Sequence, residues 1–152
     1  MADLSERKPF NRGFEPKHER RFDGFQSMLI EDDPHTLQLL GDYWLKPLGF
    51  SVRPYSSFSS ALRDIRQAEV DFDIIFTDFT LPDMKAEDFM EGVRSAGCYA
   101  PIVVVSGSSL LPARKDSIRQ QIGNVQFLMK PFDKEGFLDR LTVALPSLPN
   151  RS

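Results

Sequence analysis

Acidic, hydroxyl and basic side chains follow four apolar runs of this sequence. They are the acid pair Glu31 and Asp32 after residues 28–30, Asp78 after residues 74–77, Ser106 after residues 102–105, and Lys130 after residues 125–129. A carboxylate at the end of a buried strand costs free energy unless a cation or a hydrogen-bond donor pairs with it. The stretch DIIFTDFTLPDM offers Asp78 no neighbouring cation. We therefore expect its partners to come from distant parts of the chain.

Alternating apolar patterns indicate the elements that would position these side chains. We predict strands at residues 28–30, 50–54, 72–77, 102–105 and 125–129, and helices at residues 34–48, 57–67, 85–95, 112–122 and 134–145. Asp33 followed by Pro34 is typical of a helix start, because aspartate caps the first turn and proline has no N–H to lose there. Strands that alternate with helices predict a parallel α/β sheet with helices on both faces.

The carboxyl ends of neighbouring parallel strands meet at one edge of such a sheet, where ligands bind. Neighbouring strands lie about 4.8 Å apart, so the five side chains should converge there. Three carboxylates in one pocket favour a cation. Lys130 supplies one positive charge, and an all-oxygen site suits Mg²⁺, with Mn²⁺ as an alternative. The simpler interpretation is that Lys130 only forms a salt bridge with Asp78 that ties two strands together.

Composition narrows the class of protein. The chain has 152 residues, 41% of them hydrophobic, which suits one domain with one core. The formal charge of −3 argues against non-specific binding to nucleic acid or to an anionic membrane. The longest apolar runs are too short to span a bilayer. A single cysteine, Cys98, excludes an internal disulfide and agrees with a cytoplasmic location.

The two ends of the sequence differ from the middle. Residues 1–26 mix charges, prolines and four phenylalanines without a period, which predicts a flexible arm; the alternative is an arm whose aromatic residues dock on this domain or on a partner. We place the domain at residues 27–145 and a tail at residues 146–152. The tail leaves no room for an effector domain, so we expect the output to be a protein contact or onward phosphotransfer.

The motifs LIEDDP, IIFTDFTLPDM, PIVVVSGSS and FLMKPF occur in this order at the predicted strand ends. Together they resemble the receiver domain of two-component response regulators, over residues 27–145. The resemblance implies the flavodoxin-like receiver fold, a doubly wound five-stranded parallel sheet of order 2-1-3-4-5. It implies a phosphoacceptor switch that catalyses only its own phosphorylation and dephosphorylation.

The resemblance also assigns roles to individual residues. Asp78 would accept the phosphoryl group as a carboxylate nucleophile. Mg²⁺ would be bound by Asp32, Asp78 and the backbone carbonyl of Thr80, and by Glu31 through water. Ser106 would be the switch hydroxyl, Lys130 the phosphate-contacting lysine and Phe127 the switch aromatic, although Phe127 also suits an ordinary core position. The bond between Lys130 and Pro131 would be cis.

Some positions depart from the family pattern. Ala86 stands where the family usually has glycine, which could shift the start of the helix predicted at residues 85–95. Gly123-Asn124 replaces a common Gly-Ala pair. Thr80 and Ser108 occupy positions that tune phosphoryl lifetime in the family, and both are small and polar here.

Three functions remain open at this point. The first is a phosphoacceptor switch, monomeric or weakly dimeric, that takes its phosphoryl group from a histidine kinase or a histidine phosphotransfer protein and acts on an unknown downstream protein. The second is a receiver fold used as an interaction module that is never phosphorylated. The third is an aspartyl-phosphate phosphohydrolase of the haloacid dehalogenase type. That type needs an acid two residues after the nucleophile, where this chain has Thr80.

Overall fold

The computed structural model describes residues 21–68, 70–107 and 110–145. Its main sheet has five parallel strands in the order β2-β1-β3-β6-β7. The strands are β1 (Gln26–Ile30), β2 (Ser51–Tyr55), β3 (Ile74–Asp78), β6 (Ile102–Ser106) and β7 (Val125–Met129). Numbered among these five alone, the order is 2-1-3-4-5, which confirms the predicted sheet.

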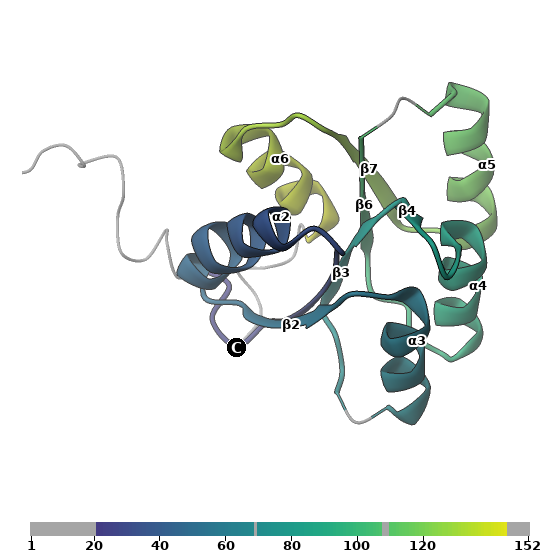
Figure 1. Cartoon of the computed structure of the whole chain (residues 1–152), viewed down its shortest axis with the longest axis horizontal. Helices are drawn as coiled ribbons and strands as arrows, with labels where there is room; N and C mark the ends of the chain where they lie inside the picture. Colours follow the sequence, from purple (N-terminus) through teal and green to yellow (C-terminus); the bar gives the residue numbers. More distant parts are fainter. Residues whose placement is uncertain (1–20, 69, 108–109, 146–152) are drawn as a thin grey trace, which may run out of the picture.

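Helices cover both faces of the sheet (Figure 1). On one face lie α3 (Phe58–Gln67), α4 (Ala86–Ser95) and α5 (Pro112–Ile122), and on the other lie α2 (Pro34–Gln38), its continuation and α6 (Lys134–Ala144). Successive residues of β3 alternate between two apolar clusters: Ile75 packs toward α3 and α4, whereas Ile74 and Phe76 pack toward α6. This alternation follows from the two-residue period of a strand, and it explains why the central strands are apolar on both faces.

Several helices begin at a side-chain cap, and the one cap predicted from the sequence, Asp33, is confirmed. Asp33 accepts a hydrogen bond from the Thr36 N–H at 3.1 Å, and Pro34 is the first residue of α2. Ser57 caps α3 in the same way, and Asp133 caps α6 by accepting from the Gly136 N–H at 2.8 Å. Despite Ala86, α4 begins within one residue of its predicted start. Among the described helices, none is long and apolar enough to cross a membrane.

Two local features differ from the predicted elements. The helix expected at residues 34–48 is α-helical only in α2; it continues as a π-helix, η2 (Leu39–Leu45), and ends as a 3-10 turn, η3 (Lys46–Leu48). A short antiparallel hairpin, β4 (Thr80–Leu81) with β5 (Met84–Lys85), follows Asp78 where a loop was expected. The hairpin determines how the chain leaves the end of β3.

The packed core reaches into the segment before Ser27. Phe22 and Phe25 are buried, and the Phe22 ring stacks on Phe50 with 4.7 Å between centroids. The Phe22 N–H also donates to the Leu48 carbonyl at 2.9 Å. These two phenylalanines therefore dock on the domain itself. Residues 1–20 and the tail, residues 146–152, lie outside the described residues, so the extent of the arm stays a prediction.

Candidate functional site

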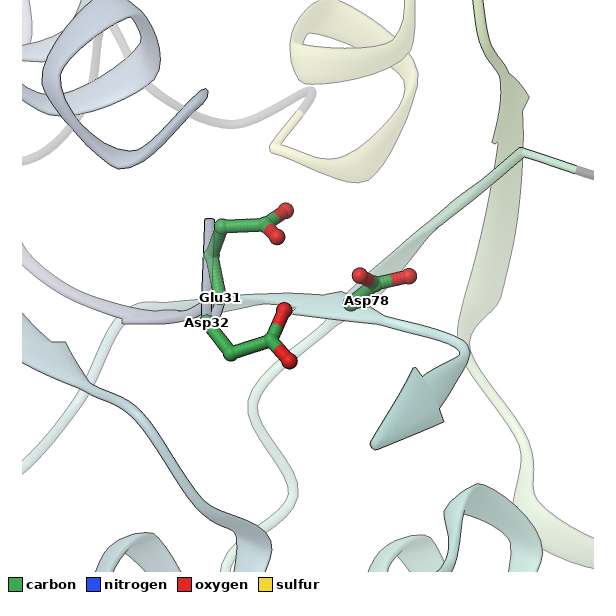
Figure 2. A group of neighbouring side chains, drawn as sticks. All are labelled: Glu31, Asp32 and Asp78. Carbon is green, nitrogen blue, oxygen red and sulfur yellow. The ribbon is translucent and has the colours of Figure 1, made fainter. Parts of the chain in front are cut away.

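The carboxyl ends of β1 and β3 bring three acidic side chains together. Glu31 and Asp32 directly follow β1, and Asp78 is the last residue of β3, the neighbouring strand. Each contributes a carboxylate oxygen to a group whose members all lie within 4.8 Å of one another. Figure 2 shows Glu31 and Asp32 extending from the end of β1 toward Asp78. The predicted convergence of residues 31, 32 and 78 is confirmed.

Lys130 is the cation that the fold places against this group. It follows the edge strand β7, and its Nζ lies 3.4 Å from Glu31 Oε1 and 3.9 Å from Asp78 Oδ2. The Lys130 N–H donates to the carbonyl of Ser106 at 2.7 Å, which fixes the lysine at the end of β6. The Lys130–Pro131 peptide bond is cis. Lys130 thus lies near two acids, one after β1 and one in β3. The simpler interpretation, in which it forms a salt bridge with Asp78 alone, does not account for the contact with Glu31.

Glu31 is the buried member of the acidic group, with 2% of its surface exposed. Its Oε2 accepts from the Asp33 N–H at 3.1 Å, and its Oε1 faces Lys130. Burial raises the pKa of the Glu31 carboxyl, and the nearby Asp78 charge adds to this rise. The Asp33 hydrogen bond and Lys130 offset only part of it. The fold therefore disfavours the ionised form of Glu31.

The raised Glu31 pKa predicts a pH-dependent stability. The folded protein holds this proton more tightly than the unfolded chain, so stability should fall as the pH rises from the usual glutamate range through the raised value. We expect Glu31→Gln to increase the free energy of unfolding by about 1 kcal/mol at pH 7 and to leave it nearly unchanged at pH 4, because a buried charge with incomplete pairing is removed.

Urea unfolding in EDTA, followed by the fluorescence of Trp44, would measure this effect. Glu91→Gln is the matched control, because Glu91 is an exposed residue of α4. A Glu31→Gln protein less stable than the natural chain at pH 7 would contradict the electrostatic account.

The residues of this group fit a divalent cation. Three carboxylates face one lysine, which leaves an excess of negative charge at the edge of the sheet. All the acidic donors are oxygens, and Asp32 is exposed to solvent. Mg²⁺ prefers oxygen ligands and keeps several waters, so an open carboxylate site of this kind suits it. The structure thus supports the predicted type of metal site.

Ser106 and Phe127, the two residues to which the family resemblance assigns a switch role, lie on the neighbouring strands β6 and β7. Ser106, 6% exposed, ends β6 one position beyond Val105, the register partner of Asp78. Phe127 lies inside β7, and its ring packs in the apolar cluster below α5 with 9% of its surface exposed. The edge of the sheet therefore carries Ser106, whereas Phe127 lies under the neighbouring helix.

The loop after Asp78 has an anchor that the sequence did not indicate. Asp83 accepts from the backbone N–H groups of Ser59 at 2.9 Å and Phe58 at 3.2 Å, so the hairpin is tied to the start of α3. Burial acts to raise the Asp83 pKa, but these hydrogen bonds outweigh it and lower the pKa. Within the hairpin, the Thr80 N–H points to Asp78 Oδ1 at 3.5 Å. Ser108 lies outside the described residues.

Comparisons with known proteins agree with this geometry. Residues 28–142 match the model of the response regulator receiver domain. The chain is 32% identical over 114 residues to the cell cycle transcriptional regulator CtrA of Caulobacter vibrioides, which covers 75% of this chain and 47% of CtrA. It is 33% identical over 122 residues to the transcriptional regulatory protein KdpE of Mycobacterium tuberculosis, covering 78% and 50%. The chain thus spans about half the length of these curated relatives.

Solved structures show the same fold. The chemotaxis protein CheY4 of Vibrio cholerae superposes with a TM-score of 0.68 at 25% identity, over 80% of this chain and 98% of that chain. The family match covers most of the chain, from the middle of β1 into the last turn of α6, and includes each strand end that carries an acid or the lysine. This protein belongs to the response regulator receiver domain family of two-component signalling.

Proposed function

We propose that this protein is a phosphoacceptor switch in which Asp78 receives a phosphoryl group from a histidine kinase or a histidine phosphotransfer protein. The observation that carries the proposal is the position of the Asp78 carboxylate, which is grouped with two further acids and lies 3.9 Å from the ammonium group of Lys130. Asp78 is part-buried, with a side chain 13% exposed, so a donor can reach it from the edge of the sheet.

The chemistry is a transfer of the phosphoryl group between two side chains. An oxygen of the ionised Asp78 carboxylate attacks phosphorus, and a P–O bond forms as the P–N bond of the phosphohistidine breaks. The imidazole nitrogen leaves with the electron pair of that bond and takes a proton from solvent. Lys130 would hold an oxygen of the transferred group, and the distance of 3.9 Å between its Nζ and Asp78 Oδ2 supports this role.

Asp32, Asp78 and the backbone carbonyl of Thr80 would hold Mg²⁺. Both oxygens of Glu31 already face protein donors, Lys130 and the Asp33 N–H, so Glu31 suits contact through a water. Mg²⁺ held there would supply positive charge to neutralise the phosphoryl oxygens during transfer. In this arrangement Asp32 is the exposed ligand and Glu31 the buried acid that keeps the site negative.

The signal would leave the site through Ser106. A phosphorylated Asp78 carries about −2 charge and three acceptor oxygens, so the Ser106 hydroxyl is drawn toward it. Ser106 also lines a cavity of about 200 Å³ between α5, β7 and α6, with Leu110, Lys115, Phe127 and Arg140 among its other lining residues. A displacement of Ser106 would therefore reshape the α5–β7–α6 surface that a downstream protein contacts.

As a switch aromatic, Phe127 would turn inward when Asp78 is phosphorylated, but its ring is already largely buried. It is already 9% exposed, and it lies under the cationic groups of Lys115 and Arg119, at 5.7 Å and 5.0 Å from the ring centroid. We therefore assign the main change to Ser106 and α5, and a smaller one to Phe127.

Metal dependence tests the proposed site. We expect one phosphoryl group per chain when the protein is incubated with phosphoramidate and Mg²⁺, and none when EDTA removes the metal, because the acids otherwise repel the donor. Intact mass gives the stoichiometry. Independently of phosphorylation, Mg²⁺ should raise the unfolding temperature by binding the folded state, and Asp32→Asn should abolish this rise. An EDTA-insensitive adduct would contradict the metal site.

The same experiment separates the two competing functions. An unmodified chain with every donor, including phosphohistidine, would favour a receiver fold used as an interaction module. Steady turnover of unrelated phosphate esters would favour a phosphohydrolase.

A further inference from the structure

Helix α5 is attached to the domain differently at its two ends. The buried residues of α5 are Ile118 and Ile122, both in its second half, where they join the apolar cluster under the sheet. The first half, PARKDS, buries no apolar side chain. Apolar burial is the main force that holds a helix to a sheet, so the N-terminal half of α5 needs another attachment.

Arg114 supplies that attachment. Its Nη2 and Nε lie 2.7 Å and 3.0 Å from Glu87 Oε2, in the first turn of α4. Its guanidinium carbon also lies 5.0 Å from the centroid of the Phe79 ring. A single side chain thus joins α5, α4 and the residue that directly follows Asp78.

These contacts lie on the path that the proposed signal would take. Five residues separate Ser106 from Pro112, the first residue of α5. Because the connection is short in sequence, we expect a displacement of Ser106 to reach the start of α5. The Phe79 N–H donates to the Val105 carbonyl at 3.1 Å, so Phe79 is held to the sheet and does not follow the helix. Movement of the start of α5 therefore has to break the contacts of Arg114 with Glu87 and Phe79.

We propose that Arg114 is a positioning residue that holds the start of α5 in the unphosphorylated arrangement and so slows phosphorylation of Asp78. We call its contacts with Glu87 and Phe79 the Arg114 latch. The inference rests on the proposed function, because it concerns the rate of that reaction. A ligand or modification shifts a two-state equilibrium by the difference in free energy between the states, so a latch made only in the resting state opposes activation.

The expected effect follows from the exposure of the ion pair. The Arg114 and Glu87 side chains are 51% and 26% exposed, so the pair is partly screened by solvent. We expect Arg114→Gln and Glu87→Gln each to accelerate phosphorylation of Asp78 by phosphoramidate about two- to fivefold. Arg114→Lys keeps the charge but loses the planar fork, so its rate should lie between that of Arg114→Gln and that of the natural chain.

A double-mutant cycle tests the latch through initial phosphorylation rates from intact mass. The double variant should be no faster than the faster single variant, because both substitutions break the same contact. Arg63→Gln is the control: it removes an exposed arginine that lies 3.9 Å from Asp64 on α3, away from α5, and should leave the rate unchanged. An acceleration distinguishes the latch from a merely structural contact, because a contact made equally in both states would change the free energy of unfolding but not the rate of phosphorylation.

The outcomes separate this inference from the proposed function. A natural chain that is phosphorylated, with variants that are unchanged or slower, would overturn the latch and leave the function intact. Accelerations that multiply in the double variant would also overturn it, because they would show two independent contacts. A natural chain that takes no phosphoryl group would overturn both.

Discussion

Asp78→Asn should abolish phosphorylation completely while the fold is retained. The amide has no ionised oxygen to attack phosphorus, and the other acids of the group, Glu31 and Asp32, follow β1 rather than standing at the end of β3. We expect no mass increase in this variant under conditions in which the natural chain gains one phosphoryl group.

The same substitution should raise the stability of the metal-free protein. It removes one of three carboxylates that lie within 4.8 Å of one another, and therefore relieves repulsion. A higher unfolding temperature in EDTA would show that the loss of phosphorylation is not a loss of folding. Asp42→Asn is the matched control, because Asp42 forms an exposed pair with Lys46 at 2.8 Å. Phosphorylation that persists in Asp78→Asn would mean that another carboxylate is the acceptor.

Lys130→Gln should lower the rate of phosphorylation by about 100-fold, the order seen when a preorganised group that stabilises transition-state charge is removed. Glutamine keeps much of the length of lysine but cannot neutralise a phosphoryl oxygen. The substitution also removes the cation that lies 3.4 Å from Glu31 and 3.9 Å from Asp78. Initial rates from phosphoramidate at saturating Mg²⁺ would measure the effect.

Lys130→Gln should lower the stability of the protein, whereas Asp78→Asn should raise it. We expect Lys130→Gln to cost about 1–2 kcal/mol of unfolding free energy, below the range for a fully buried pair because the Lys130 side chain is 28% exposed. Lys46→Gln, which breaks an exposed pair on the surface of η2 and η3, should change neither quantity. A rate within about threefold of the natural one corresponds to no more than the free energy of an exposed ion pair. Such a rate would show that Lys130 is only a structural partner of the acids.

The arrangement of the sheet and its acidic edge could be predicted because local patterns determine them. Apolar runs, caps and breaks identify strands and helices, and the rule that parallel strands present their carboxyl ends at one edge brings residues 31, 32, 78 and 130 together. Asp33 caps α2 as its position before Pro34 indicated. A site built from strand ends is therefore readable from the sequence even when its members are a hundred residues apart.

Features that depend on contacts between distant surfaces could not be predicted in this way. The apolar spacing of residues 34–48 fits an α-helix, and nothing local indicates the π-helical turns of η2. The arm before Ser27 has no period, so the docking of its aromatic residues was only an alternative, and the contacts of Phe22 with Phe50 and Phe25 appear only in the folded structure. The latch joins Glu87 to Arg114 across 27 residues, with no pattern that links them.

Trapping the phosphorylated residue tests the central claim most directly. Borohydride reduces an aspartyl phosphate to the alcohol homoserine, and peptide mapping then locates the altered residue. After phosphorylation with Mg²⁺, we expect homoserine in the peptide that contains FTDFT, in place of Asp78 and nowhere else in the chain. Homoserine at another acid, or a phosphorylated chain with an unaltered Asp78, would contradict the assignment of the site.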